Sequence, residues 1–159
     1  MVVSAKDKEV LDGLLAEAEG LDSPVLFLLH RMQEHWGHVN WDIANYVADS
    51  IGVPLTQLYS AVTFYEEFSL EMTGKYVVHL CRGVVCHARG SREISEGIRE
   101  YLGIHDGETT ADGLFTLRES SCIGQCDGSP AMMVNERVHR ELDLDRAIAI
   151  LKDLGKGGE

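Results

Sequence analysis

Residues 76–86 read YVVHLCRGVVC. The first five are apolar or β-branched apart from one histidine, and this composition predicts a strand that is buried in a sheet. Cys81 stands at the end of the predicted strand, and Cys86 follows after four further residues. The stretch therefore predicts a pair of thiols in a loop that leaves one edge of a sheet.

A second pair of cysteines repeats this arrangement. Residues 114–120 alternate in the manner of a strand, and the sequence CIGQC soon after them places Cys122 and Cys126 with three residues between them. The ends of two strands in one sheet can lie side by side, so the two loops can meet. The sequence thus predicts that four thiols gather around one point.

The rest of the C-terminal half mixes helices with strands. Turn and capping residues predict, in order, a helix over 91–103, short strands over 131–134 and 138–142, and a helix over 143–155. Ser91 and Asp143 are the expected N-caps of the two helices. The order β-α-β-β-β-α predicts a small α/β domain with a mixed sheet over residues 74–159.

The N-terminal half reads as helices. Apolar residues recur at helical spacing in four stretches, over residues 6–19, 24–36, 41–51 and 55–65. Asn40 is an expected N-cap, and Gly37 and Gly52 are expected to end the second and third helices. Residues 1–73 are therefore predicted to form a helical bundle ahead of the α/β domain.

The charge and hydropathy of the chain exclude several classes of function. The 159 residues include 14 Lys and Arg against 26 Asp and Glu, for a formal net charge of -12. This acidity argues against binding to nucleic acid or to an anionic membrane surface. No apolar stretch approaches the roughly 20 residues of a spanning helix, and the start of the chain resembles neither a signal nor a transit peptide. We expect a cytoplasmic protein without direct membrane insertion.

Four thiols in a reducing compartment favour metal binding or redox chemistry over structural disulfides. Thiolates are soft ligands that suit iron–sulfur clusters and zinc. The intervals of four and three residues are wider than the usual Cys-x2-Cys zinc knuckle, so they favour a 2Fe–2S cluster while leaving zinc open. Gly83, Gly124 and Gly128 lie inside or beside the two loops. We expect their backbone N–H groups to turn toward the cluster sulfurs.

The combined motifs resemble one family closely. From about His30 onward, the chain is similar to the thioredoxin-like 2Fe–2S subunit of NADH:quinone oxidoreductase, which has homologues in NAD-linked or electron-bifurcating hydrogenases and in formate dehydrogenases. The matching stretches are AVTFY (61–65), VVCH (84–87), GETTADG (107–113), CIGQC (122–126) and PAMMVN (130–135). The resemblance implies a thioredoxin-like fold, a cis peptide bond before Pro130, and a 2Fe–2S cluster. Its ligands would be Cys81, Cys86, Cys122 and Cys126.

The resemblance also implies a role. A 2Fe–2S cluster takes up one electron whereas NADH gives up two, and the chain has neither a dinucleotide fingerprint nor a phosphate-binding loop. FMN and NAD(H) would therefore sit on a partner, the flavoprotein subunit of an NAD(H)-dependent oxidoreductase complex. We expect this chain to be its non-catalytic electron-transfer subunit, with residues 1–73 as the docking element and no residue acting as acid, base or nucleophile.

Other interpretations remain open. The same four cysteines could hold zinc in a structural or assembly adaptor. A thiol–disulfide enzyme is disfavoured because the chain has no Cys-x-x-Cys motif. His87 is expected to be a surface residue, and His35 with His38 and Glu34 to be a polar cluster at a helix end. The aromatic residues Trp36, Phe64, Tyr65 and Phe68 fit a core or an interface equally well.

Overall fold

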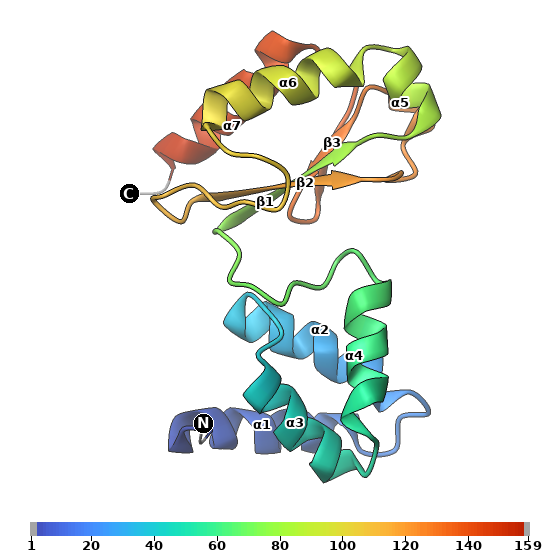
Figure 1. The fold of residues 1–159 in the computed structure, drawn as a ribbon, viewed down its shortest axis with the longest axis vertical. Helices are drawn as coiled ribbons and strands as arrows, with labels where there is room; N and C mark the ends of the chain where they lie inside the picture. Colours follow the sequence, from blue (N-terminus) through green and yellow to red (C-terminus); the bar gives the residue numbers. More distant parts are fainter. Residues whose placement is uncertain (1–2, 158–159) are drawn as a thin grey trace. The chain divides into compact units, whose positions relative to one another are not determined.

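The computed structural model describes residues 3–157 (Figure 1). The chain forms two compact units, and the division between them falls between Met72 and Thr73. This point lies one residue before the boundary expected from the sequence.

The N-terminal unit is built from helices at the four expected places. They are α1 (Ala5–Ala18), α2 (Pro24–Trp36), α3 (Trp41–Ile51) and α4 (Leu55–Phe64). The Asn40 side chain accepts hydrogen bonds from the backbone N–H groups of Asp42 and Ile43, as an N-cap does. Gly37 and Gly52 end α2 and α3 in the left-handed conformation, which glycine adopts without steric cost. The predicted caps of these helices are confirmed.

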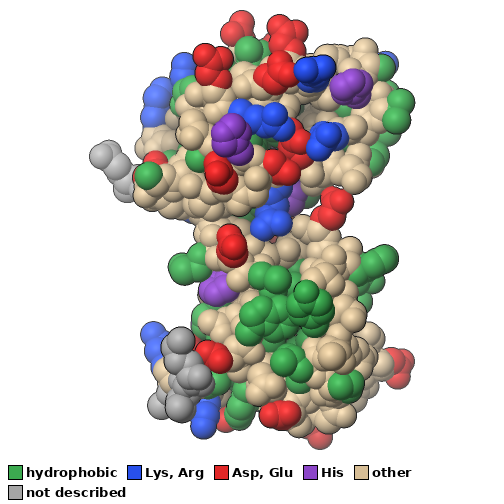
Figure 2. All heavy atoms as spheres, in the orientation of Figure 1, with side chains coloured by type: hydrophobic (Ala, Val, Ile, Leu, Met, Phe, Trp, Pro, Cys, Tyr) green, Lys and Arg blue, Asp and Glu red, His purple; other side chains and the backbone are tan. Residues whose placement is uncertain are grey.

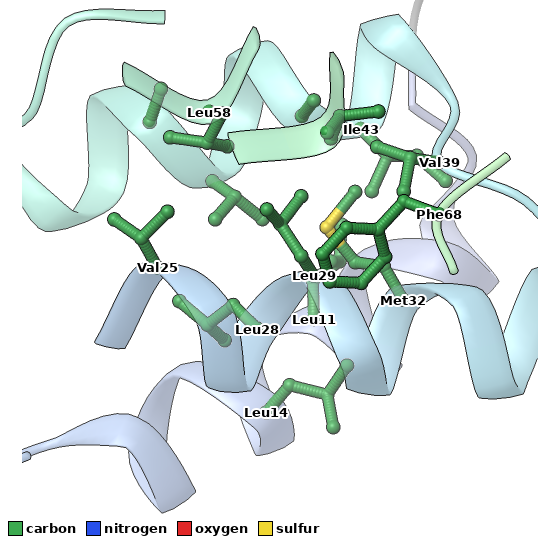
Figure 3. Close-up of a cluster of buried hydrophobic side chains, with 14 of the residues drawn as sticks. Leu11, Leu14, Val25, Leu28, Leu29, Met32, Val39, Ile43, Leu58 and Phe68 are labelled. Atoms are coloured by element: carbon green, nitrogen blue, oxygen red, sulfur yellow. The ribbon is translucent and has the colours of Figure 1, made fainter. Parts of the chain in front are cut away.

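An apolar core joins the four helices of this unit (Figure 3). Leu11 of α1, Leu29 of α2, Val47 of α3 and Leu58 of α4 are all fully buried within one cluster. Phe68, from the segment after α4, also packs into this cluster. Each helix therefore buries one face against the others, which gives most of the stabilisation of a small helical unit.

The C-terminal unit contains a mixed sheet in the strand order β2-β1-β3-β4. The strands are β1 (Tyr76–Cys81), β2 (Phe115–Ser120), β3 (Met132–Val134) and β4 (Arg137–His139). β1 pairs with β2 in parallel and with β3 in antiparallel orientation. The longer helices α6 (Ser91–Leu102) and α7 (Leu144–Lys156) lie on the same face of the sheet (Figure 1). The expected α/β class with a mixed sheet is confirmed.

Some local predictions in this unit were wrong. Ser91 is the first residue of α6 rather than its N-cap, because Gly90 takes the capping position in a left-handed conformation. Asp143 does cap α7, which continues past Gly155 to Lys156. The strand expected over 138–142 is shorter and ends at His139, where residues 140–143 turn toward α7.

β2 also does not alternate as expected. Phe115, Thr116 and Leu117 are all buried. The segment before β2 runs beside its edge, since the N–H of Thr110 donates to the carbonyl of Phe115 and the N–H of Leu117 donates to the carbonyl of Glu108. The Thr116 hydroxyl also forms hydrogen bonds with the N–H of Gly74 and the hydroxyl of Thr109, contacts that the alternation of the sequence does not reveal.

Candidate metal centre

The two cysteine pairs lie at one edge of the sheet. Cys81 is the last residue of β1, and Cys122 follows the last residue of β2 after one intervening serine. The two strands are parallel, with Cys81 opposite Ser120, so both chains leave the sheet at the same end. Cys86 lies in a short helix, α5 (Val84–Ala88), and Cys126 opens the short 3-10 helix η1 (Cys126–Gly128). Both places were expected from the sequence to be plain loops.

Backbone contacts hold the first loop against the second. The N–H of Arg82 donates to the carbonyl of Ser120 at 2.8 Å. A Cβ atom on Gly83 would lie 3.3 Å from the carbonyl oxygen of Ser121 and 3.4 Å from Sγ of Cys81. Gly83 is therefore suited to this position because a larger residue would press on both cysteine loops.

All four cysteines are free thiols, but their environments differ. Cys81 and Cys86 are buried, whereas Cys122 and Cys126 are exposed. Cys81 forms hydrogen bonds with Cys86 and Cys122, and Cys122 forms one with Cys126. Hydrogen bonds therefore link Cys86 to Cys81, Cys81 to Cys122, and Cys122 to Cys126. Among residues 3–157, no three His, Cys, Asp or Glu side chains are grouped closely enough to bind one metal ion.

Backbone N–H groups point at the sulfur atoms. Burial alone would raise the pKa of the Cys81 thiol. Hydrogen bonds from the N–H groups of Ile123 and Gly83, and from the thiols of Cys86 and Cys122, outweigh burial and hold this pKa below its usual value. The N–H of Gly124 lies 3.4 Å from Sγ of Cys122. Two of the three glycines singled out in the sequence therefore have their N–H groups directed at sulfur.

Cys86 and Cys126 are held more firmly in the neutral form than Cys81. Burial and the hydrogen bond with Cys81 raise the pKa of Cys86 to about 11, although the N–H of Ala131 acts to lower it. The hydrogen bond with Cys122 and the negative charge of that neighbour raise the pKa of Cys126. Thiols that are hydrogen-bonded to one another in this way cannot all ionise unless positive charge is placed among them, and metal ions supply such charge.

Gly128 has a different role from the one expected. Its N–H donates to the carbonyl of Gln125 rather than to a sulfur atom. A Cβ at this position would collide with the side chain of Arg140, which forms an ion pair with Asp127. Gly128 therefore makes room for Arg140 beside the second loop.

Sequence reasoning missed two donors to sulfur, the backbone N–H groups of Ile123 and Ala131. Every residue except proline carries a backbone N–H, so the residue type at these positions gives no signal. The peptide bond between Ser129 and Pro130, just before Ala131, is cis, as the resemblance implied.

A buried carboxylate beside the loops was also missed. The side chain of Glu119, near the end of β2, is only 6% exposed and bridges two arginines. Its Oε2 lies 2.8 Å from Nη1 of Arg82, and its Oε1 accepts hydrogen bonds from Arg99 and from Ser95 at 2.7 Å. Glu119 thus ties the first cysteine loop, through Arg82, to α6. Buried charges are normally paired in this way, but a sequence does not show which Glu is buried.

The structure shows the surroundings of three histidines and of Glu34. His87 is exposed on α5, as expected. Nδ1 of His79 lies 3.0 Å from Oγ of Ser120. At the end of α2, Nδ1 of His38 lies 3.0 Å from the carbonyl oxygen of Trp36, and Glu34 forms an ion pair with Arg31. His38 and Glu34 thus have different partners at this end of the helix.

Four free thiols at the carboxyl ends of two parallel strands, with backbone N–H groups directed at them, define a small α/β metal–thiolate protein. The family model described as thioredoxin-like [2Fe-2S] ferredoxin matches residues 11–155, and the chain belongs to this family. The family expected from the resemblance, its thioredoxin-like fold and its 2Fe–2S cofactor are confirmed. The four thiols and the N–H groups around them fit such a cluster, since thiolates bind iron and N–H groups stabilise the sulfurs.

Named relatives come from two kinds of oxidoreductase complex. The HndA subunit of the NADP-reducing hydrogenase of Solidesulfovibrio fructosivorans is 35% identical over 112 residues, which are 70% of this chain and 66% of HndA. One subunit of the NADH-quinone oxidoreductase of Escherichia coli strain K12 is 31% identical over 140 residues, which are 88% of this chain and 84% of the relative.

A solved structure shares the fold. The crystal structure of an air-oxidized NAD+-reducing [NiFe]-hydrogenase matches 83% of this chain with a TM-score of 0.71 and 21% identity. The match spans only 23% of the hydrogenase chain. In the part of this chain that the structure describes, no helix is both long enough and apolar enough to cross a membrane.

Proposed function

We propose that this chain is the one-electron transfer subunit of an NAD(H)-dependent oxidoreductase complex. Cys81, Cys86, Cys122 and Cys126 would hold the cluster, which when bound takes up and returns one electron at a time. The observation that carries this proposal is that two pairs of free thiols follow two parallel strands at one edge of the sheet and are linked by thiol–thiol hydrogen bonds. No residue of the chain is assigned a catalytic role.

The surrounding residues would adjust the stability and potential of the centre. The N–H groups of Gly83, Ile123, Gly124 and Ala131 point at sulfur atoms, and such hydrogen bonds favour negative charge on sulfur. Cys81 and Cys86 are buried, while Cys122 and Cys126 face solvent. We infer that electrons enter and leave on the side of the second cysteine pair, where the path to a partner is shortest.

The partner would be a flavoprotein subunit that carries FMN and binds NAD(H). The relatives named above are subunits of an NADP-reducing hydrogenase and of an NADH-quinone oxidoreductase, which supports this assignment. Nothing in the sequence suggests that the chain binds a nucleotide itself. A flavin that converts electron pairs into single electrons is therefore needed on another chain.

Metal analysis distinguishes this proposal from the alternative in which the four cysteines hold zinc in a structural or assembly adaptor. The full-length chain, purified without oxygen, should contain about two irons and two acid-labile sulfides. Dithionite reduction should then produce a rhombic spin-half EPR signal. Stoichiometric zinc without sulfide or signal, from cells grown with ample iron, would contradict electron transfer and support a structural role.

The N-terminal unit would provide the docking element for the flavoprotein. Phe64, at the end of α4, is 78% exposed and its ring contacts that of Tyr65, whereas Phe68 is buried in the core. Among the aromatic residues that could have been core or interface, Phe68 therefore belongs to the core, whereas Phe64 is available for an interface.

We expect Phe64→Ser to reduce co-purification of the flavoprotein several-fold, because an exposed aromatic residue often anchors an interface. The matched control is Tyr101→Ser, which removes a 42% exposed aromatic ring from α6 in the other unit. Circular dichroism should show that both variants remain folded. Equal co-purification of the Phe64 variant and the unaltered chain would argue against docking through this surface.

A further inference from the structure

The two units of the chain differ in charge. Residues 1–72 contain 3 Lys and Arg against 12 Asp and Glu, whereas residues 73–159 contain 11 against 14. Between Arg31 and Lys75 the sequence has no Lys or Arg, although six of its acidic residues fall in this interval. The acidity of the chain is therefore concentrated in the N-terminal unit, which carries no lysine or arginine after Arg31.

The end of α4 and the segment after it expose apolar side chains within this acidic unit. Besides Phe64, Met72 is 75% exposed, and Tyr65 and Leu70 are each 39% exposed. These side chains belong to residues 64–72, which we call the α4 tail. Figure 2 shows a group of hydrophobic side chains on the N-terminal unit beside α4, with acidic side chains around it. An apolar surface with a charged border is the usual composition of a protein interface.

Contacts with α2 hold the α4 tail in a fixed conformation. The N–H of Ser69 donates to Oε1 of Gln33 at 2.7 Å, and Nε2 of Gln33 donates to the carbonyl of Glu67. Phe68 is buried, and the centroid of its ring lies 5.0 Å from that of His30. The exposed apolar side chains are therefore presented on an ordered segment, which reduces the entropy that is lost when a partner binds.

The cations that flank the α4 tail in the sequence make contacts outside it. The guanidinium of Arg31 forms ion pairs with Glu17 and Glu34. The ammonium of Lys75 lies 5.3 Å from the centroid of the Tyr76 ring.

The α4 tail itself carries three carboxylates. Glu66, Glu67 and Glu71 are all exposed. Nε2 of His30 lies 3.1 Å from the carboxylate of Glu67, so protonation of this ring would offset one of the three charges. Even then, the α4 tail and His30 together remain negative. A surface that complements the α4 tail is therefore apolar at its centre and basic at its border.

We propose that the α4 tail docks on a basic apolar surface of the flavoprotein subunit, in which lysine or arginine side chains border a hydrophobic contact. This inference rests on the proposed function and adds the chemistry of the partner's contact surface. Attraction between opposite charges orients the encounter and raises its rate more than it raises affinity. The same acidity disfavours a second copy of this chain as the occupant, because two such tails would repel each other.

The first test measures how fast the two chains associate. The full-length chain, loaded with its cluster, is presented at increasing ionic strength to the immobilised flavoprotein subunit with its FMN. We expect the association rate constant to fall as salt increases, because salt screens the attraction. Glu71→Lys should lower this rate constant several-fold at low salt and flatten its salt dependence, because the substitution reverses one charge of the α4 tail.

The matched control is Glu100→Lys, which makes the same change of charge at an exposed position of α6 in the other unit. The control should leave the association rate constant nearly unchanged. Equal effects of the two substitutions, or association that does not respond to salt, would overturn the proposal. If the flavoprotein fails to bind even the unaltered chain, the proposed partner is wrong as well, whereas iron and sulfide analysis reports on the cluster independently.

A second readout locates the contact directly. A carbodiimide activates a carboxylate of the complex, a lysine amine beside it attacks the activated carbon, and an amide bond forms as the urea leaves. Mass spectrometry of the digested complex should find cross-links from the α4 tail to lysines of the flavoprotein. Cross-links only from carboxylates of residues 73–157, or from the α4 tail to a second copy of this chain, would overturn the proposal.

Discussion

The full-length chain with Cys86→Ala should bind less than a tenth of the iron held by the unaltered chain. Cys86 is buried beside Cys81, and alanine offers no ligand atom in its place. A two-iron centre that lacks one of four thiolates loses both charge compensation and coordination. Iron and sulfide analysis with EPR of the reduced protein would measure the loss.

The control for this variant is the adjacent residue. His87 is exposed on α5, so His87→Ala should keep the iron, the sulfide and the EPR signal. Retention of two irons and an unchanged signal by Cys86→Ala would show that Cys86 is not a ligand. If Cys86→Ala instead loses zinc, the structural-adaptor interpretation gains support.

The Glu119→Gln substitution should destabilise the C-terminal unit by about 2 kcal/mol. The amide keeps the shape of the side chain and can still accept from Ser95, but it leaves the guanidinium of Arg99 without its buried counter-charge. The side chain of Arg82 is 64% exposed, so water compensates most of the loss of its ion pair with Glu119. The expected cost therefore comes mainly from the pair with Arg99.

Hydrogen exchange followed by mass spectrometry can assign this loss to the correct unit. Amides of β1 and β2 should exchange faster in the variant, whereas amides of α1 to α4 should not change. The chain has two tryptophans, Trp36 and Trp41, both in the N-terminal unit, so tryptophan fluorescence gives an independent control. Glu96→Gln breaks an exposed ion pair with Arg92 and should cost much less than Glu119→Gln.

A double-mutant cycle then isolates the buried pair. Combining Glu119→Gln with Arg99→Met should cost clearly less than the sum of the single substitutions, because each single change strands the other charge. Strict additivity would mean that Glu119 and Arg99 do not interact as described, and that the loss arises from packing alone.

Most secondary structure could be predicted from local signals. The Asn40 cap, the Gly37 and Gly52 helix ends, and the Asp143 cap all depend on hydrogen bonds within a few residues. Such bonds follow from the chemistry of the residue and its near neighbours. One error arose where a neighbouring residue competed, because Gly90 takes the place of Ser91 at the cap of α6.

The cysteine pairs were predictable for a similar reason. Their spacing after two apolar runs is a property of the sequence, and parallel pairing of β1 with β2 was enough to bring them to one edge. The short helix α5 was missed because a helix of five residues is too short to show a periodic pattern.

The sequence by itself determined where the longer helices and the strands form, and that four cysteines stand after two strands, since these properties depend on residues close together in the chain. Only the tertiary structure decided which N–H groups face sulfur, that Glu119 is buried between Arg82 and Arg99, and that Gly128 makes room for Arg140. Each of these depends on contacts between segments far apart in sequence. Burial and hydrogen-bond direction at such contacts are set by packing, which residue types alone do not specify.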